Sequence, residues 1–271
     1  MRRWAVCRAT QYSIVRIDGY SLEHRWIGPP PGDRPTLVFL HEGLGSVSLW
    51  RDFPDGLCER TGCSGLVYSR AGHGASDPRL DARSPCFMHH EALVVLPQVL
   101  QACQVQDAIL VGHSDGASIA IIATGLGAIA PRGLILEAPH LFVEEPTIDS
   151  IRRTADRYRS TDLRDRLARH HGANVDALFE DWTRVWLSPE FASWNIEACV
   201  KGMNRPTLVI QGQDDEYGTP EQVKAIAGAL GENCEVLMLA DCRHTPHADQ
   251  RAPVEDAMVR FIGRLSGGFR R

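Results

Sequence analysis

The stretch AILVGHSDGASIAIIA, residues 108–123, decides the fold of this chain. Four apolar residues, a Gly-His-Ser-Asp-Gly pentapeptide and a run of small residues predict a strand, a sharp turn and a helix, with Ser114 at the apex. A serine on such a turn has a strained backbone that pushes its hydroxyl out of the sheet. Gly112 and Gly116 leave room for the bend, because a Cβ at either position would clash. The helix that follows points unpaired N–H groups at any oxyanion formed there, which favours a nucleophilic serine.

Strands and helices alternate on both sides of this turn. Apolar and alternating patterns predict strands at residues 11–17, 20–26, 36–40, 65–69, 133–136, 206–210 and 235–239. Helical patterns predict helices at residues 53–60, 89–104 and 220–230, and a last helix from residue 253. The helix at 89–104 is expected to kink at Pro97 and to bury one face, made of Leu93, Leu96, Leu100 and Cys103. This order predicts an α/β fold with a mostly parallel central sheet flanked by helices.

The alternation stops after His140 and resumes near residue 204. Residues 141–203 contain no strand-like run, and their charged, helical segments lie at 151–158, 163–170 and 175–186. We therefore expect a core made of residues 1–140 and 204–271, split by a helical insertion at 141–203. An insertion of this size in an otherwise compact domain is typical of a functional element.

Composition excludes several classes of protein. The 271 residues carry a formal net charge of −5, which argues against nucleic acid as a partner because phosphate requires a basic surface. No apolar segment follows Met1-Arg2-Arg3-Trp4, so we expect no signal peptide, and the apolar stretch at 117–130 is too short to span a membrane. The eight cysteines, Cys7 among them, show no metal-ligand spacing, which predicts reduced thiols, a cytoplasmic location and no metal site.

A serine hydroxyl needs a histidine to take its proton and a carboxylate to orient that histidine. Such groups are expected where parallel strands end at their carboxyl edge. Asp214 and Asp215 follow the strand at 206–210, and His244 and His247 follow the strand at 235–239.

At these residues the chain resembles the α/β-hydrolase family, in its serine-nucleophile, cap-bearing form. The resemblance rests on residues 40–46 (LHEGLGS), 69–76 (SRAGHGAS), 112–116 (GHSDG) and 212–215 (GQDD), and on His244. It implies the α/β-hydrolase fold, with residues 141–203 as a helical cap after the sixth strand; we call these residues the cap segment.

The resemblance also implies the roles of the site residues. Ser114 would be the nucleophile, His244 the general base and then acid, and Asp215 the orienting acid, with Asp214 as the alternative. The oxyanion hole would be the backbone N–H groups of Gly43 and Asp115. His247 is a rival for the base, although its position at the start of the next helix favours packing.

Three residues depart from the common pattern of that family. Glu42 stands where glycine is usual in the oxyanion loop, so we expect its carboxylate to point away or to be paired. Ser69 stands where aspartate is common. Asp115 follows the nucleophile directly, where its side chain would narrow the pocket or contact a polar substrate. These departures bear on the substrate and leave the predicted fold unchanged.

Other side chains are candidates for the substrate pocket. His140, at the entrance to the cap segment, either touches substrate or packs. Trp182 and Trp186 lie four residues apart on one helix face, which either packs the cap segment on the core or lines a pocket above Ser114. We also include Glu42 in this pocket. His73 is expected to be structural, and the pairs at 89–90 and 170–171 to face solvent.

The predicted function is hydrolysis of a small ester or thioester through an acyl-enzyme on Ser114, with a small molecule as partner and no cofactor or metal. The same triad serves hydrolysis of a carbon–carbon bond in β-diketone-like compounds and acyl transfer to another acceptor. A non-catalytic receptor on the same fold is the alternative from a different class. Nucleic acid and membranes are not expected as partners.

Overall fold

The computed structural model describes residues 12–28, 32 and 34–267, and within them an eight-stranded sheet runs through the centre of the molecule. The strand order is β1-β2-β4-β3-β5-β6-β7-β8. The strands are β1 (Tyr12–Ile17), β2 (Tyr20–Ile27), β3 (Thr36–Leu40), β4 (Ser64–Tyr68), β5 (Ala108–His113), β6 (Gly133–Glu137), β7 (Thr207–Gly212) and β8 (Cys234–Leu239). Each lies within a residue or two of its expected range. The predicted first strand began at Gln11, which lies outside the described residues, as do Cys7 and the first four residues.

The sheet is mostly parallel, as predicted. β1 and β2 form an antiparallel hairpin and β2 pairs antiparallel with β4, whereas all pairs from β4 through β3 to β8 are parallel. The hairpin turn at Asp18 and Gly19 has positive φ at both residues, 51° and 82°. This is the backbone that matches the twist of the two strands, and it explains an Asp-Gly pair there.

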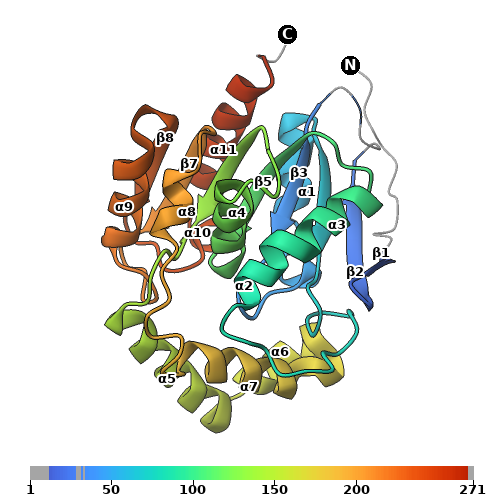
Figure 1. Cartoon of the computed structure of the whole chain (residues 1–271), viewed down its shortest axis with the longest axis vertical. Helices are drawn as coiled ribbons and strands as arrows, with labels where there is room; N and C mark the ends of the chain where they lie inside the picture. The colour runs from blue at the N-terminus through green and yellow to red at the C-terminus, as the bar shows by residue number, and fades with distance from the viewer. Residues whose placement is uncertain (1–11, 29–31, 33, 268–271) are drawn as a thin grey trace.

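The central strands are buried on both faces, which is why their sequences are continuously apolar. Alternate side chains enter two separate clusters. Val38 and Leu110 pack into the cluster that contains helix α4 (Asp115–Gly125), and Leu37 and Ile109 pack into the cluster that contains α1 (Phe53–Thr61) and α11 (Arg251–Leu265). Figure 1 shows α4 in front of the sheet. The sheet is therefore the rigid middle layer that fixes the position of Ser114.

The remaining helices connect and cover these strands. They are α2 (Phe87–His90), α3 (Leu96–Ala102), α5 (Glu145–Ser160), α6 (Leu163–His171), α7 (Val175–Trp186), α8 (Glu197–Lys201), α9 (Pro220–Leu230) and α10 (Pro246–Asp249). Short 3₁₀ turns lie at Val47–Trp50, Gly172–Asn174 and Gly231–Asn233. In the described part of the chain, no helix is both long and apolar enough to cross a membrane.

The helix predicted at 89–104 is divided by a π-helical turn at Glu91–Val95, directly before Pro97. Proline lacks an N–H and its ring crowds the preceding carbonyls, so the turn before it widens. The wider turn rotates the helix face. Leu93 is consequently 40% exposed, contrary to our prediction, while Leu96 and Leu100 are buried as expected.

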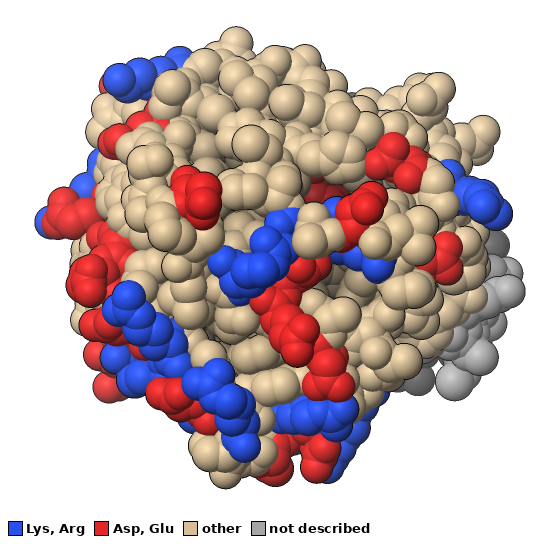
Figure 2. Space-filling view, turned by 60° about the horizontal axis from the view of Figure 1, so that its bottom comes forward, with Lys and Arg blue, Asp and Glu red and all other residues tan. Residues whose placement is uncertain are grey.

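The cap segment is helical as expected. Figure 1 shows α5, α6 and α7 together below the sheet, and α5 and α6 both contact α7. An isolated bridge between Phe142 and Asn195 joins the two ends of the segment, and α8 packs on α4 and α9. Figure 2 brings this side forward and shows positive and negative side chains interleaved over it. The boundaries of the cap segment as a unit stay a prediction.

The seven cysteines in the described part of the chain are free thiols. Four of them, Cys58, Cys63, Cys199 and Cys242, are buried, and Cys86 is exposed.

Candidate active site

Ser114 lies on a sharp turn between β5 and α4, where its backbone has φ 53° and ψ −117°. A residue with a side chain is strained at positive φ, and such strain persists only where the surroundings enforce it. A Cβ on Gly112 would lie 2.5 Å from the carbonyl oxygen of Gly116, and one on Gly116 would lie 2.0 Å from that of Leu40. Both glycines are therefore required by close backbone approach, as the sequence predicts.

Two loops at the carboxyl edge of the sheet bring a histidine and a carboxylate to Ser114. The loop after β8 places His244 Nε2 at 2.9 Å from Ser114 Oγ. The loop after β7 places Asp215 Oδ1 at 2.8 Å from His244 Nδ1. The same oxygen of Asp215 accepts the backbone N–H groups of Tyr217 and Gly218, which fix its position. Serine, histidine and carboxylate thus form one continuous chain of hydrogen bonds.

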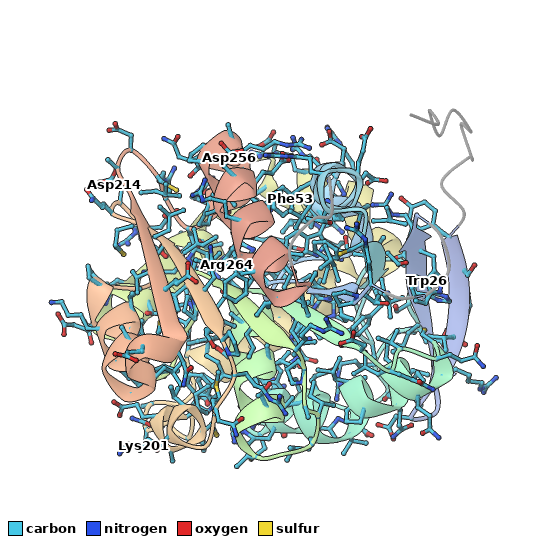
Figure 3. The ribbon with its side chains drawn as sticks, turned by 90° about the horizontal axis from the view of Figure 1, so that it is seen from above. Trp26, Phe53, Lys201, Asp214, Asp256 and Arg264 are labelled. Carbon is cyan, nitrogen blue, oxygen red and sulfur yellow. The ribbon has the colours of Figure 1, made fainter. Side chains whose placement is uncertain are left out.

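The structure distinguishes the two adjacent aspartates. The side chain of Asp215 is 1% exposed and contacts His244. Asp214 is exposed, and its backbone N–H donates to the carbonyl oxygen of Cys242. Figure 3 labels Asp214 at the edge of the molecule. Asp214 is therefore not part of the chain of hydrogen bonds that joins Ser114, His244 and Asp215.

The charges around His244 favour its protonated form. Burial lowers the pKa of His244, but the Asp215 carboxylate, its hydrogen bond to Nδ1 and the carboxylates of Glu216 and Glu42 outweigh burial, so the pKa lies above its ordinary value. For Asp215, burial raises the pKa, and the charge and hydrogen bond of His244 outweigh it, so the pKa lies below its usual value. The pair is arranged to stabilise a positive charge on the histidine.

Gly43 and Asp115, the residues of the predicted oxyanion hole, lie close together, since Asp115 Oδ2 is 3.3 Å from where a Cβ of Gly43 would be. Asp115 is the first residue of α4, so no earlier turn of that helix accepts its N–H. Gly43 lies in the loop after β3, directly below α7, and a Cβ there would lie 2.4 Å from Trp182 Nε1. A residue with a side chain at this position would require the Trp182 ring to move. The catalytic use of these two N–H groups stays a prediction.

Glu42 is paired, as expected. Its Oε2 accepts the N–H of Leu44 at 2.5 Å, within the same loop. Burial raises the pKa of this carboxyl. Glu42 also lines a cavity of about 350 Å³, together with Trp50, His113 and His247. Ser114 and His244 are not among the residues that line this cavity, so it lies beside the hydrogen-bonded chain and does not contain it.

His140 packs against both His244 and Trp186, and Trp182 packs against Gly43. The His140 ring lies 5.6 Å from that of His244 and 5.4 Å from that of Trp186, between centroids. Burial lowers the pKa of His140 to about 3, so its ring is neutral. Trp182 and Trp186 are both buried, and Trp182 lies over Gly43. Their face packs the cap segment on the core; contact with substrate stays a prediction.

The other histidines have structural partners. His73 is fully buried and lies 3.2 Å from the carbonyl oxygen of Gly43, in agreement with the structural role expected for it. His247, the rival base, donates Nδ1–H to Glu137 Oε2 at 3.0 Å, and its own position does not reach Ser114. Glu137 is completely buried at the end of β6. His247 is thus held by a different carboxylate.

The prediction that residues 170 and 171 both face solvent is wrong for His171. His171 is buried, accepts the N–H of Gly74 at Nδ1, and therefore donates from Nε2 to the carbonyl oxygen of Leu44. Helix α6 ends in the polar run Arg169-His170-His171, which gives no sign that its last residue turns into the core. His90 is exposed and His89 partly so, as expected.

Sequence reasoning also missed three charged residues beside the site. The hydroxyl of Ser69 donates to Glu23 Oε2 at 2.8 Å, so β2 supplies a carboxylate where the family commonly has aspartate. Arg70 and Arg83 are almost completely buried near Asp115. An arginine inside the SRAGHGAS motif was the available signal. In the described part of the chain, no group of three His, Cys, Asp or Glu side chains is arranged to hold a metal ion.

Comparison with known proteins places this geometry in a family. A family model described as "Alpha/beta hydrolase family" matches residues 37–257. The 2-succinyl-6-hydroxy-2,4-cyclohexadiene-1-carboxylate synthase of Escherichia coli is 29% identical over 161 residues, which are 59% of this chain and 57% of that protein. The match thus spans a little over half the length of that relative.

Solved structures share the fold at low sequence identity. A thermophilic esterase from Thermogutta terrifontis superposes with a TM-score of 0.71 at 19% identity, covering 94% of this chain and 99% of the other. Proline iminopeptidase from Mycobacterium smegmatis gives a TM-score of 0.72 at 16% identity, with the same two coverages of 94% and 99%. An esterase and a peptidase are equally similar here, so these likenesses show the fold alone. The family match over most of the chain, the fold and the nucleophile turn together identify this protein as a member of the alpha/beta hydrolase family.

Proposed function

We propose that this protein is a serine hydrolase that cleaves a small ester or thioester through an acyl-enzyme on Ser114. The observation that carries the proposal is the chain of hydrogen bonds from Ser114 Oγ through His244 to Asp215, at 2.9 and 2.8 Å. These distances are within the range at which a histidine removes a proton from a nucleophile. No other described serine is placed on a strained strand-to-helix turn against a histidine–carboxylate pair.

The proposed reaction has two steps, acylation of Ser114 and hydrolysis of the acyl-enzyme. His244 Nε2 takes the Ser114 proton while Oγ attacks the acyl carbon, and the N–H groups of Gly43 and Asp115 stabilise the oxyanion. His244 then gives the proton to the leaving alcohol or thiol, and the C–O or C–S bond breaks. A water molecule then attacks the acyl-enzyme while His244 takes its proton. His244 returns that proton to Ser114 Oγ as the ester bond to the serine breaks and the acid leaves. Throughout the reaction the Asp215 carboxylate accepts the Nδ1–H of His244, so that Nε2 of the same ring faces Ser114.

Turnover of an ester and thioester panel by wild type and Ser114→Ala tests this proposal. The variant is expected to fold and to lose turnover by on the order of 10⁴-fold or more, since the nucleophile is gone. Substantial turnover by folded Ser114→Ala would contradict the assignment.

A second candidate is the hydrolysis of a carbon–carbon bond in a β-diketone-like compound. The name of the 29%-identical relative describes a ring carboxylate with a succinyl ketone side chain and no ester. If Ser114 is reactive but the ester and thioester panel is not turned over, a panel of β-diketones is the discriminating assay. Acyl transfer to a second substrate is recognised by adding alcohols or thiols and looking for a new ester.

A further inference from the structure

Two arginines are buried beside the proposed active site. Arg70, in the loop after β4, is 3% exposed, and Arg83, in the loop before α2, is 4% exposed. Arginine is seldom buried unless a partner satisfies its charge and its N–H groups, because desolvating an unpaired cation is costly. The partners of these two guanidinium groups therefore indicate whether they are structural or await a ligand.

In each guanidinium group one Nη atom has a partner among the described residues and the other has none, and Arg70 Nε also donates to His41 Nε2 at 3.4 Å. Arg70 Nη2 donates to the carbonyl oxygen of Glu42 at 2.8 Å, and Arg83 Nη2 lies 3.4 Å from His73 Nε2. Arg83 also stacks over the Phe87 ring at 4.7 Å. The Nη1 atoms of both arginines are buried and make no hydrogen bond with any residue that the structure describes. Buried donors without acceptors are rare in folded proteins and call for an explanation.

The surrounding carboxylates do not supply the missing acceptors. Asp115 Oδ2 lies 3.8 Å from Arg70 Nη2, which exceeds a hydrogen bond, and this oxygen makes none within the described residues. Glu91 is also buried and its charge acts on Arg83, but no hydrogen bond joins the two among the described contacts. His41 and His73 face the same cluster, and burial and the arginine charges hold the pKa of each well below its usual range, so both are neutral.

The cluster lies on the oxyanion side of Ser114. Asp115 follows the nucleophile, and its Oδ2 lies 3.3 Å from where a Cβ of Gly43 would be. Arg70 holds the same loop through Glu42. His244 must reach the leaving group and the N–H groups of Gly43 and Asp115 the oxyanion, so the carbonyl carbon of a bound substrate would lie between these groups. The two arginines lie beside this point, Arg70 next to Asp115 and Arg83 next to His73, whose ring contacts the carbonyl oxygen of Gly43.

We propose that Arg70 and Arg83 form a subsite for a carboxylate on the acyl chain, so that the substrate is a monoester or monothioester of a dicarboxylic acid. The proposal rests on the function proposed above. A carboxylate has two acceptor oxygens, one for each free Nη1, and charge-assisted hydrogen bonds are the strong ones. The cap helix α7 is bound to this loop, since Asp181 accepts the backbone N–H of Arg83 and Arg184 donates to its carbonyl oxygen.

A pair of substrates tests the subsite on the intact protein. Values of kcat/KM are measured for p-nitrophenyl hemiglutarate and for p-nitrophenyl valerate, a neutral ester of similar length. Wild type is expected to prefer the hemiglutarate by about tenfold or more, since a hydrogen bond to a charged group contributes on that scale. Arg83→Met is expected to lose this preference, which is read as the ratio of the two kcat/KM values measured on the same variant. Arg79→Met removes the same charge from the same loop outside the cluster, and is expected to keep the preference.

Equal turnover of both esters by wild type, or an unchanged preference in Arg83→Met, would overturn the subsite while leaving the esterase function standing. Protection of Ser114 from a fluorophosphonate is the second measurement, for use if Arg83→Met does not fold or neither ester is turned over. Glutarate is expected to slow the labelling of wild type and neutral glutaramide to leave it unchanged; equal effects would contradict the subsite. No turnover together with no labelling would instead overturn the proposed function, and the subsite with it.

Discussion

His171, at the end of cap helix α6, donates a hydrogen bond to the carbonyl oxygen of Leu44, the residue that follows Gly43 in the proposed oxyanion loop. The distance is 2.9 Å, and the other ring nitrogen accepts the N–H of Gly74 at 3.0 Å. One neutral histidine of the cap segment thus ties together two loops of the core; burial lowers its pKa to about 4, so it stays neutral at pH 7. The position of the oxyanion loop depends on a contact from the cap segment.

His171→Phe keeps a ring of similar size and removes both hydrogen bonds. We expect kcat to fall roughly ten- to a hundredfold with KM little changed, somewhat less than the 10²–10³ that follows loss of an oxyanion donor. The control is His170→Ala, which removes the neighbouring contact of His170 with Ser48 Oγ, at 2.9 Å, and leaves the loop untouched. Steady-state kinetics of the two variants separate the role of His171 from that of His170. A wild-type kcat in folded His171→Phe would contradict the role proposed for His171.

The adjacent aspartates provide a matched pair of variants. Asp215→Asn removes the carboxylate that orients His244 and is expected to lower kcat by on the order of 10³–10⁴-fold. Asp214→Asn changes an exposed side chain and is expected to have no effect on kcat. Equal losses in the two variants would show that the loop as a whole, and not one carboxylate, is needed.

The raised pKa of His244 sets the pH dependence. The base acts only when neutral, so kcat/KM for a neutral ester is expected to rise with pH and to reach half its plateau above pH 6.5, the ordinary value. Glu42 contributes to the raised pKa, so Glu42→Gln is expected to move the midpoint to lower pH. A wild-type midpoint below 6.5, or a shift to higher pH in the variant, would contradict this electrostatic description.

Two glycines test the backbone argument in opposite directions. Gly116→Ala places a Cβ 2.0 Å from a backbone oxygen and is expected to lower the free energy of unfolding by about 3 kcal/mol or more. Gly228→Ala, inside α9, places a Cβ where no atom lies within 4 Å, and is expected to raise it by roughly 0.5–1 kcal/mol. Urea unfolding measures both. An unchanged free energy of unfolding in Gly116→Ala would mean that the turn relaxes to accommodate the added Cβ, and would contradict the backbone argument.

The sheet could be predicted from sequence because local physics determines it. Strands such as β3 and β5 are buried on both faces, and their unbroken apolar runs express that burial directly. Helices α7 and α9 begin and end at the predicted residues because each has a strong apolar stripe with a clear start and stop. The burial of Leu93 was predicted wrongly, because the π-helical turn changes the number of residues per turn and the prediction assumed a regular α-helix.

The hydrogen-bonded chain was predictable in part. Ser114, Asp215 and His244 each follow a strand at the same edge of the sheet, so topology alone brings them together. Arg70 contacts His41 and Glu42 across two loops of the core. The contacts of His171 and of the Arg83 backbone arise instead from how the cap segment sits on the core. Such contacts join residues about a hundred positions apart and leave no local pattern in the sequence.

Labelling with a fluorophosphonate is the most direct test of the central claim that Ser114 is an activated nucleophile. Wild type and Ser114→Ala are labelled side by side and the modified peptide is mapped. The account predicts a single adduct on Ser114 in wild type and none in the variant. No labelling of folded wild type, or equal labelling of both proteins, would contradict it and would favour a non-catalytic ligand receptor on this fold.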